Sequence, residues 1–405
     1  MSKLEELIAE LCPDGVEYKS IREIAEVGTG NSNGNESVDN GLFPFFVRSQ
    51  TIKSKDDYEY DEEAIIIPGE GGIGEIFHYI NGKYALHQRV YRIHFIVEDV
   101  NTKFAYYYMQ AYFKPFILKK AVSATVTSIR KPMIEDFPLP VPPLPVQREI
   151  VRILDNFTEL TAELTAELTA RKKQYVYYRD DLLTFKNNVQ TVPLRYVVKY
   201  SCSGSTPTKG NSAFYENGTI PWIRTQDVKF NEITSVESYI TEEAVKRTAA
   251  KWIPKNCVII AISGASAGRC AVNKIEATTN QHCLNLEIDE NKALYKYVYY
   301  CVCSKYEELL SKKQGARGDL NSSLILETKI PVPQLSIQQR IVKVLDNFDA
   351  ICSDLNIGLP AEIEARKKQY EYYRDMLLTF AAADDIILTD RQTDRQTDRQ
   401  TDRQT

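Results

Sequence analysis

The sequence predicts an α+β protein in which two similar globular domains are separated by two long helices that form an antiparallel coiled coil, giving the chain a pseudo-two-fold internal repeat. Three observations predict this arrangement. Two helical sequence blocks each occur twice, apolar residues follow a coiled-coil heptad through both copies, and the segments before the helices share weaker motifs.

The repeated blocks define the organisation of the chain. Residues 145–157 read PVQREIVRILDNF, and residues 336–348, 191 positions later, read SIQQRIVKVLDNF. Residues 170–185 (ARKKQYVYYRDDLLTF) match residues 365–380 (ARKKQYEYYRDMLLTF) at 14 of 16 positions. We therefore predict a first globular domain at 1–143, a central helix at 144–190, a second globular domain at 191–332, a C-terminal helical region at 333–380 and a tail at 381–405.

The first copy carries a coiled-coil seam within one long helix. From Leu154 the alternating 3–4 spacing of a seam reaches Phe185, and only Thr161 and Arg171 interrupt it. A helix from about residue 147 to residue 185 would be roughly 60 Å long at about 1.5 Å per residue. The apolar seam residues are Leu154, Phe157, Leu164, Leu168, Tyr175, Tyr178, Leu182 and Phe185.

The second copy repeats the seam but breaks it. Gly358 and Pro360 interrupt the pattern, and proline suits the first turn of a new helix. Two similar long helices in one chain would most easily pack against each other, although the pattern alone also fits a helix that dimerises with another chain. The apolar seam residues of this copy are Leu345, Phe348, Tyr370, Tyr373, Leu377 and Phe380.

The segments before the helices share strand and turn motifs. Each has an apolar strand that runs into a glycine-rich loop, at residues 65–74 and 258–268. Each also has a Pro-aromatic segment that ends in Arg-Ser-Gln or Arg-Thr-Gln, at residues 44–50 and 221–226. Helices are predicted at 103–113 and 293–310.

The composition is that of an ordinary globular protein, with 43% hydrophobic and 26% charged residues. No apolar run reaches the roughly 18 residues that span a bilayer, and residues 1–11 lack the apolar core of a signal peptide, so we expect a cytoplasmic protein. The eight cysteines and four histidines include no short-spaced ligand set, so no metal site is predicted and His282-Cys283 is expected to be buried. The net charge of −5 lacks the basic excess that nucleic-acid-binding proteins often show.

One glycine-rich loop matches a cofactor motif, but its surroundings do not. Residues 69–74 (GEGGIG) follow a predicted strand and match G-x-G-x-x-G. A dinucleotide site needs a helix next and an acidic residue about 20 positions on. Here Asn81-Gly82 instead predicts a hairpin between strands at 75–79 and 83–94, and Arg89 stands near the position of the acid. We therefore interpret the loop as a backbone turn that could approach phosphates through its amides.

No catalytic motif is recognisable. The sequence lacks a phosphate-binding G-x-x-x-x-G-K-[ST] loop, a nucleophile elbow, an H-E-x-x-H pair and the Asn/Asp-Pro-Pro-aromatic tetrapeptide of amino-methyltransferases. We therefore predict no catalytic, cofactor-binding or metal-binding residue, which favours a binding protein over an enzyme.

The helical blocks resemble the conserved regions of Type I restriction-modification specificity subunits. The resemblance rests on QREIVRILDNF at 147–157, TAELTAELTARKKQYVYYRD at 161–180 and GLPAEIEARKKQYEYYRDMLLTF at 358–380, and with the two-copy layout it covers residues 1–380. It implies a non-catalytic subunit whose two target recognition domains each read one half of a bipartite site in double-stranded DNA. The helices would act as a spacer and dock two methyltransferase subunits.

The resemblance also implies that partner subunits carry the chemistry. Restriction subunits would join through the complex, and S-adenosylmethionine, ATP and magnesium would belong to the partners. We expect no membrane partner. Two other functions stay open: a coiled-coil assembly scaffold that does not read DNA, and a self-sufficient modification enzyme, which the missing motifs disfavour.

Basic and polar residues of the two domains supply DNA-binding candidates, because basic side chains hold phosphates and polar side chains read base edges. The pair Lys312-Lys313 is expected to hold phosphate. The candidates are Arg48, Gln50, Lys119, Lys120, Thr125, Thr127 and Arg130 in the first domain, and Lys209, Arg224, Gln226, Lys312, Lys313, Arg317, Asn321 and Ser322 in the second.

Two tetrapeptide repeats have different meanings. Residues 160–170 read LTAELTAELTA, in which each TAEL unit would add roughly 6 Å and about 40° of rotation to a helix.

The C-terminal residues 389–404 repeat TDRQ, which has no apolar residue and is expected to be disordered. The codons ACA-GAC-AGA-CAG would encode TDRQ from the DNA repeat ACAG, so slippage by one repeat would shift the reading frame. This predicts a phase-variable gene.

Overall fold

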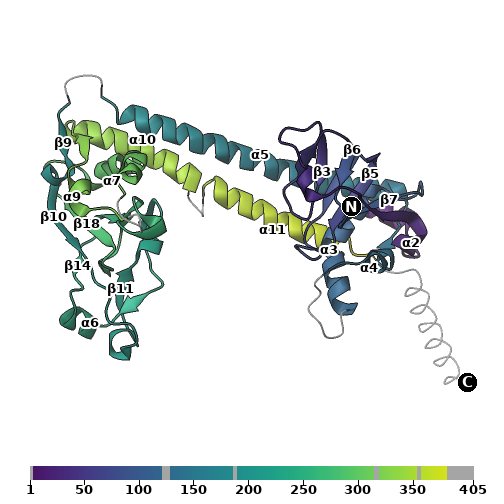
Figure 1. The fold of residues 1–405 in the computed structure, drawn as a ribbon, viewed down its shortest axis with the longest axis horizontal. Helices are drawn as coiled ribbons and strands as arrows, with labels where there is room; N and C mark the ends of the chain where they lie inside the picture. Colours follow the sequence, from purple (N-terminus) through teal and green to yellow (C-terminus); the bar gives the residue numbers. More distant parts are fainter. Residues whose placement is uncertain (1–2, 121–127, 186–188, 314–318, 354–356, 381–405) are drawn as a thin grey trace, which may run out of the picture. The chain divides into compact units, whose positions relative to one another are not determined.

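A computed structural model describes residues 3–120, 128–185, 189–313, 319–353 and 357–380. The chain divides into two compact units: unit 1 comprises residues 1–164 and 363–405, and unit 2 comprises residues 165–362. Each unit contains one globular domain of mixed helices and strands together with parts of the long helices (Figure 1). The predicted tail at 381–405 lies outside the described residues.

Unit 1 is built around a six-stranded sheet with the strand order β2-β7-β5-β6-β3-β4. Neighbouring strands are antiparallel except β3 and β6, which are parallel. Phe104 and Phe113 of α3 share one core with Ile65 and Ile93 of the sheet. The elements of this domain are α1 (Lys3–Leu11), β1 (Tyr18–Ser20), α2 (Ile21–Ile24), β2 (Ala25–Thr29), η1 (Gly34–Glu36), β3 (Phe43–Phe46), β4 (Lys53–Lys55), β5 (Tyr60–Pro68), β6 (His78–Leu86), β7 (Val90–Phe95), α3 (Thr102–Lys120), α4 (Lys131–Glu135) and β8 (Pro138–Pro140).

Unit 2 contains a five-stranded sheet, β10-β18-β15-β16-β12, and a four-stranded sheet, β13-β11-β17-β14. Tyr297 and Val298 of α7 share a core with Val258 of β15 and Leu286 of β18. The elements of this domain are β9 (Thr191–Pro193), η2 (Leu194–Tyr196), β10 (Val198–Ser203), η3 (Ser212–Phe214), β11 (Ile220–Ile223), η4 (Thr225–Asp227), β12 (Asn231–Ile233), β13 (Tyr239–Ile240), α6 (Glu242–Arg247), β14 (Trp252–Ile253), β15 (Val258–Ala261), η5 (Gly264–Ser266), β16 (Cys270–Asn273), β17 (Ala277–Thr279), β18 (Cys283–Ile288), α7 (Tyr295–Ser304), α8 (Tyr306–Ser311), α9 (Ser322–Leu326) and β19 (Lys329–Pro331).

The two domains repeat one strand plan. In unit 1, β6 pairs antiparallel with β5 and, at its end, parallel with β3. In unit 2 the same path is divided, because β16 pairs antiparallel with β15 and the following β17 pairs parallel with β11. A Cβ on Gly30 would lie 1.8 Å from the carbonyl oxygen of Leu86, and a Cβ on Gly204 would lie 1.8 Å from that of Thr279, so both domains require glycine at one close backbone approach. The prediction of two similar α+β domains is confirmed.

The predicted hairpin at Asn81-Gly82 is wrong. Both residues lie inside β6, paired with Glu63 and Glu62 of β5. The chain reverses instead through residues 69–77 before β6 and 87–89 after it. Pairing of β6 with residues 60–66 of β5 outweighs the local turn preference of Asn-Gly, and Gly82 adopts its positive φ of 125° within the strand.

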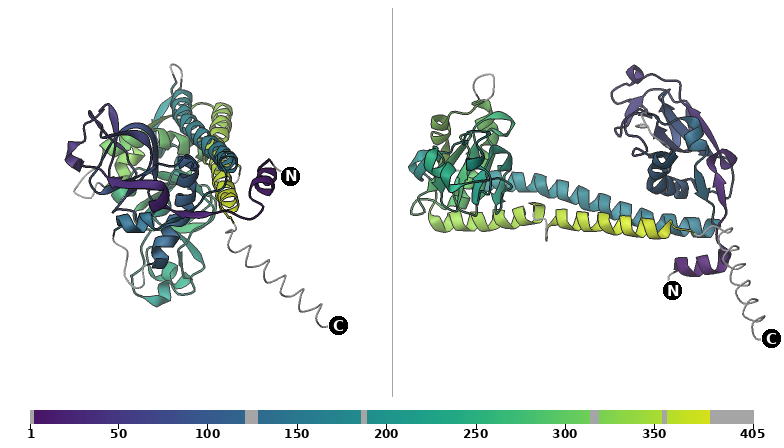
Figure 2. Two further views of the ribbon diagram at one scale, coloured as in Figure 1. Left: turned by 90° about the vertical axis from the view of Figure 1, so that its right-hand side faces the viewer. Right: turned by 90° about the horizontal axis from the view of Figure 1, so that it is seen from below.

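The long helices pair antiparallel within each unit. α5 (Leu144–Leu182) continues from unit 1 into unit 2, whereas α10 (Leu335–Ser353) and α11 (Leu359–Leu377) are separate helices, as the break at Gly358 predicts. α11 lies beside the first part of α5 in unit 1, and α10 lies beside its last part in unit 2 (Figures 1 and 2).

The same pair of motif positions joins the helices in both units. In unit 1 the Phe157 ring stacks on Tyr373 with centroids 5.4 Å apart, and in unit 2 Phe348 stacks on Tyr178 at 5.5 Å. Each stack joins the phenylalanine of an LDNF block to the second tyrosine of a YYRD block. Of the predicted seam residues, Leu154, Leu345 and Leu377 are buried, Tyr178 is 38% exposed, and Phe157, Leu164, Leu168, Tyr175, Leu182, Phe185, Phe348, Tyr370, Tyr373 and Phe380 are half-buried.

A buried glutamine fixes each globular domain to its helix. The Gln147 side chain accepts a hydrogen bond from the Asn101 amide at 2.8 Å and donates to the carbonyl oxygens of Asp99 at 2.7 Å and Pro142 at 2.6 Å. Gln338 makes the same set in unit 2: it accepts from the Leu294 amide at 2.9 Å and donates to the carbonyls of Lys292 and Pro333 at 3.4 and 2.8 Å. Both glutamine side chains are fully buried, and their hydrogen bonds to the carbonyl oxygens of Pro142 and Pro333 are buried as well.

A charged contact further along the helix repeats as well. Asp155 accepts from the Lys103 ammonium at 2.7 Å and from the Tyr107 hydroxyl at 2.6 Å. Asp346 accepts from Lys296 at 2.9 Å and from Tyr300 at 2.6 Å. The first helix after each sheet is thereby bound to the long helix that leaves its domain.

We expect Gln338→Ala to lower the free energy of unfolding by at least about 2 kcal/mol, because it leaves buried backbone groups without partners. Urea unfolding of the full chain followed by circular dichroism measures this. The neighbouring Gln339 is exposed, so Gln339→Ala is the matched control and should change stability by less than about 0.5 kcal/mol. Equal effects of the two variants would contradict the role of the buried amide.

Glu149 supplies a pH-dependent contact at the start of α5. Its carboxylate is 4% exposed and is bound by Arg152 at 2.6 Å and by Lys3 of α1 at 3.0 Å. Hydrogen bonding to Arg152, and then to Lys3, lowers the pKa of Glu149 from 4.5 to about 2. A carboxyl whose pKa is lower in the folded state stabilises fully above its unfolded value, and this contribution is lost as the pH falls from 4.5 towards 2.

We therefore expect Glu149→Gln to destabilise the chain at pH 7 and to have a smaller effect at pH 3. Unfolding free energies of both proteins at the two pH values give the comparison. Glu159 is exposed on the same helix, so Glu159→Gln should have a small effect at either pH. A Glu149→Gln effect that stays constant between pH 7 and pH 3 would show that the carboxylate charge is not the stabilising feature.

Candidate nucleic-acid interface

Four segments of unit 1 meet at one corner of the domain, where β5 ends. The Gly69 amide donates to the Arg89 carbonyl oxygen at 3.0 Å, and the Gly69 carbonyl accepts from the Ile129 amide at 2.7 Å. Gly71 has a φ of +82°, and a Cβ there would lie 2.9 Å from the Arg48 carbonyl oxygen. These contacts join the loops after β3, β5 and β6 to the segment before α4. We call this place corner 1, defined by Arg48, Glu70, Arg89 and Arg130.

Unit 2 builds the equivalent corner with the same backbone contacts. The Ile262 amide donates to the His282 carbonyl oxygen at 2.9 Å, and the Ile262 carbonyl accepts from the Leu320 amide at 2.8 Å. The Asn280 amide donates to the carbonyl of Ile223 at 3.0 Å, which adds the loop after β11. We call this place corner 2, defined by Arg224, Ser263, Gln281, His282 and Asn321.

The side chains of corner 1 form an exposed charged cluster. The Glu70 carboxylate accepts from the Arg48 guanidinium at 3.0 Å and from the Arg89 guanidinium at 3.1 Å. Hydrogen bonding to Arg48, and then to Arg89, lowers the pKa of Glu70. Arg48 and Arg89 are 47% and 57% exposed, so both remain accessible from solvent. Two positive charges on one carboxylate leave the cluster with a net positive charge.

A hollow of about 230 Å³ adjoins this cluster and is lined by Gly34, Val47, Arg48, Ser49, Lys53 and His87. The Arg89 amide donates to Nδ1 of His87 at 3.0 Å, so the neutral ring carries its proton on Nε2. Burial lowers the pKa of His87, and the charges of Arg48 and Arg89 lower it further. At neutral pH the ring therefore offers an uncharged N–H donor beside two cations.

Corner 2 presents mainly neutral polar groups. Gln281 accepts a hydrogen bond from the Thr206 hydroxyl, and its amide nitrogen lies 3.1 Å from Nε2 of His282. The Arg224 guanidinium lies over the Trp222 ring at 5.9 Å, and its buried Nε has no hydrogen-bond partner in the described part of the chain. The two corners share a backbone arrangement but differ in charge.

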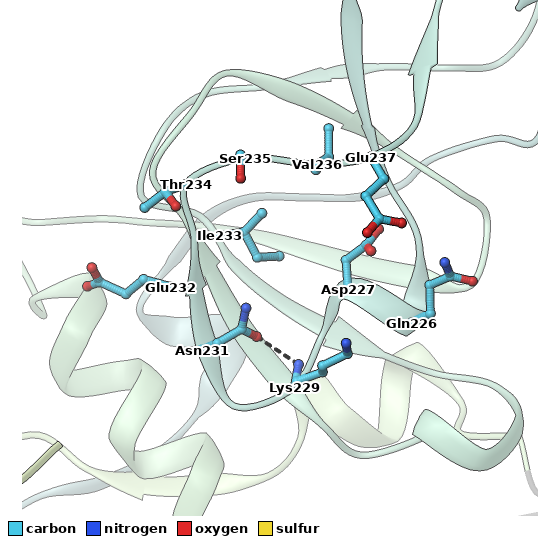
Figure 3. Close-up of a pocket in the computed structure, with 10 residues that line it drawn as sticks. All are labelled: Gln226, Asp227, Lys229, Asn231, Glu232, Ile233, Thr234, Ser235, Val236 and Glu237. Atoms are coloured by element: carbon cyan, nitrogen blue, oxygen red, sulfur yellow. Dashed lines mark hydrogen bonds between the residues drawn. The ribbon is translucent and has the colours of Figure 1, made fainter. Parts of the chain in front are cut away.

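A separate hollow of about 400 Å³ in unit 2 is lined by Gln226, Asp227, Lys229, Asn231, Glu232, Ile233, Thr234, Ser235, Val236 and Glu237 (Figure 3). Asp227 also accepts from the Arg224 amide at 2.8 Å. The carboxylates of Asp227, Glu232 and Glu237 would repel a phosphate, so Gln226 does not lie in a phosphate-binding hollow.

The structure brings some of the predicted DNA-binding residues together and leaves others apart. Arg48 lies in corner 1, and Arg130 directly follows Ile129, whose amide binds Gly69 there. Arg224 lies in corner 2, and Asn321 and Ser322 directly follow Leu320, whose amide binds Ile262 there. Asn321 caps α9 by accepting from the Ser323 amide at 2.8 Å, so its oxygen is engaged. Of the remaining candidates, Gln50, Lys119, Lys209 and Gln226 are exposed, Lys312 binds Glu308 at 2.6 Å and Lys313 is half-buried, while Thr125, Thr127, Arg317 and the side chain of Lys120 lie outside the described residues.

Sequence reasoning missed Glu70, Arg89, Gln281 and His282. His282 is half-buried and not buried as expected, whereas Cys283 is fully buried. The glycine-rich loop was the available signal, because it marks the close backbone approach around which corner 1 forms. Among the described residues no cluster of three or more His, Cys, Asp or Glu could hold a metal ion. None of the described helices is long and apolar enough to cross a membrane.

Comparison with known proteins identifies a family for both halves of the chain. The family model described as "Type I restriction modification DNA specificity domain" matches residues 13–171 and 186–365. The EcoR124I/EcoR124II specificity subunit of Escherichia coli is 41% identical over 261 residues, which span 62% of this chain and 64% of that protein. A putative type I restriction enzyme specificity subunit of Haemophilus influenzae is 29% identical over 90% of this chain and 96% of its own length.

Two solved structures share the fold. The S subunit of a Type I restriction-modification system from M. genitalium matches with a TM-score of 0.56 and 15% identity, covering 90% of this chain and 95% of its own. A chain from a study of complex assembly and conformational transition in a type I system matches with a TM-score of 0.61 and 15% identity, covering 90% and 97%. Both likenesses extend over the two domains and the helices.

The predicted phosphate contact of Lys312 and Lys313 is tested by changing both to alanine. If the pair holds phosphate, DNA binding weakens for all sequences and the slope of log K against log salt becomes shallower by about 0.9 for each phosphate that the variant no longer neutralises. Binding by the assembled complex at several salt concentrations measures the slope. Lys246 also pairs with a glutamate, Glu242, so Lys246→Ala is the control. A slope equal to that of the control would contradict the phosphate-binding role.

Proposed function

Because the chain belongs to the family of Type I restriction-modification DNA specificity proteins, we propose that it is the subunit that selects the DNA sequence on which its complex acts. The observation that carries the proposal is the duplication: the family model matches each half of the chain separately, at residues 13–171 and 186–365. Each half also contains the same corner of four converging segments. One chain would thus contain two DNA-recognition domains of similar structure.

Two readers on one chain suit a bipartite DNA target. Each would contact one short half-site through its corner, and the bases between the half-sites would not be read. Basic groups would set the position on the backbone, while polar groups would contact base edges. The chain itself would be non-catalytic and would work in the cytoplasm, and S-adenosylmethionine, ATP and magnesium would bind to its partners.

The decisive experiment maps DNA methylation in cells that carry this gene with its partner subunits, and in cells from which this gene is deleted. A bipartite methylated motif with an unread gap that disappears on deletion is expected. Unchanged methylation in cells with an active methyltransferase would overturn the proposal.

The same maps separate the two alternative functions. A coiled-coil scaffold would leave the motif unchanged on deletion, and the assembled complex would show no sequence preference in a gel-shift assay. A self-sufficient enzyme would methylate or cleave DNA as a purified chain without partner subunits.

The long helices offer two equivalent positions for docking methyltransferase subunits. Tyr177 of α5 is 67% exposed in unit 2, and Tyr372 of α11 is 66% exposed in unit 1. Both are the first tyrosine of a YYRD block, and each contacts the neighbouring tyrosine that stacks in the coiled coil. A large aromatic side chain left exposed twice in a repeat is suited to an interface with two identical partners. Restriction subunits would join through the resulting complex.

We expect Tyr177→Ala combined with Tyr372→Ala to release both methyltransferase subunits, and each single variant to release one. Co-purification with the subunits, followed by mass measurement of the complex, gives the stoichiometry. Tyr200 of β10 is 50% exposed outside the repeat, so Tyr200→Ala should retain both subunits. Full occupancy in the double variant would contradict the docking role.

The TAEL repeats of α5 are proposed to set the length of the unread gap. Deleting residues 161–164 shortens the helix by roughly 6 Å, against about 3.4 Å for each base pair of DNA. We expect the gap to shorten by one or two base pairs while both half-sites stay unchanged. A methylation map with the original gap would contradict this, and Thr161→Ala without deletion is the control for local helix effects.

The TDRQ tail is proposed to mark a phase-variable gene whose reading frame changes after the second conserved helix. The nucleotide sequence tests this. Uninterrupted copies of ACAG support the proposal, and mixed synonymous codons contradict it.

A further inference from the structure

We propose that corner 1 selects a G·C base pair through Arg48, Glu70 and Arg89, which makes these residues sequence determinants of unit 1. The proposal rests on the DNA-specificity function proposed above. It assigns the base-reading role to one cluster of unit 1 and to one class of base pair.

The hydrogen-bonding groups of the cluster match both edges of this base pair. An arginine fork can donate two hydrogen bonds to O6 and N7 of guanine, and a glutamate can accept one from N4 of cytosine. Both Arg48 and Arg89 use Nη1 to bind Glu70, and neither makes another side-chain hydrogen bond within the described residues. The rest of each fork is therefore free to donate, and the carboxylate holds both forks in place before DNA arrives.

The central carboxylate favours a base edge over a phosphate. Glu70 lies within 3.1 Å of both guanidinium groups, so a phosphate bound by either arginine would stand close to a negative charge. A guanine edge is uncharged, and the amino group of its cytosine partner is a donor that Glu70 can bind. His87, whose neutral ring carries its proton on Nε2, lines the hollow beside Arg48.

Comparison of the two corners distinguishes a reading role from a structural one. The backbone contacts that hold the corners together are the same, but Ser263 follows Ile262 where Glu70 follows Gly69, and His282 stands where Arg89 stands. Corner 2 keeps its arrangement without a carboxylate between two arginines. The charged cluster is therefore not needed to hold this fold together. Different side chains at the two corners are what the recognition of two different half-sites would require.

The test maps methylation in cells that express the complete complex with Arg89→Lys or Glu70→Gln. Lysine keeps the positive charge, so a phosphate contact would survive, but it loses the planar fork. We expect discrimination at one G·C position of one half-site to fall by at least about tenfold in each variant. The other half-site and the gap should stay unchanged.

Two variants serve as controls. Lys19 binds Asp99 at the opposite end of β7 from Arg89, so Lys19→Ala should leave the motif unchanged. Gln281→Ala in corner 2 should relax only the other half-site.

The possible outcomes separate the proposed role of corner 1 from the proposed specificity function of the chain. A uniform loss of methylation with the motif intact, a native motif in both variants, or relaxation at an A·T position would overturn the role of corner 1 while leaving the specificity function in place. A wild-type map without any bipartite motif would instead overturn the proposed function.

Discussion

The rest of the structure depends on two buried amides. Gln147 and Gln338 have fully buried side chains, and each satisfies three backbone groups. Because a planar amide can meet one donor and two acceptors only in a narrow range of orientations, it fixes how each long helix leaves its globular domain. The Lys-Asp-Tyr contacts of Asp155 and Asp346 then hold the helix along the domain. In each unit the helix that these contacts orient also carries the phenylalanine of the aromatic stack, Phe157 in α5 and Phe348 in α10.

The two corners are held together in a different way from the contacts between helix and domain. Their residues lie on loops after strands and before short helices, and backbone hydrogen bonds hold them in place. Side chains there can differ between the two domains, as Glu70 and Ser263 do, without changing the path of the chain. The helices therefore have near-identical sequences in the two copies, whereas the loops of the corners differ in sequence.

The sequence predicted the features that depend on periodicity. The helix expected at about 147–185 is observed at Leu144–Leu182, and the break at Gly358 separates α10 from α11. The hairpin at Asn81-Gly82 was wrong because the local preference for a turn does not include the long partner strand β5. Arg89 could not be placed beside Glu70 from the sequence, because the residues are 19 positions apart and meet only through sheet register. The sequence likewise did not show that the side chain of Asn321, a predicted DNA-binding residue, caps a helix.

Unit 2 is one continuous stretch of chain, whereas unit 1 is completed by α11 from the far end of the sequence. A ribosome therefore releases every residue of unit 2 before it releases residues 363–377, the part of α11 that belongs to unit 1. Until then Phe157 lacks Tyr373, and the apolar seam of α5 within unit 1 is open to solvent or to another chain. Bringing these distant segments together costs loop-closure entropy once, and this cost increases only slowly with the number of residues between them. The packing of α11 on α5 thus comes last in folding unit 1, and a chain that stops at residue 362 would contain all of unit 2 but only the first segment of unit 1.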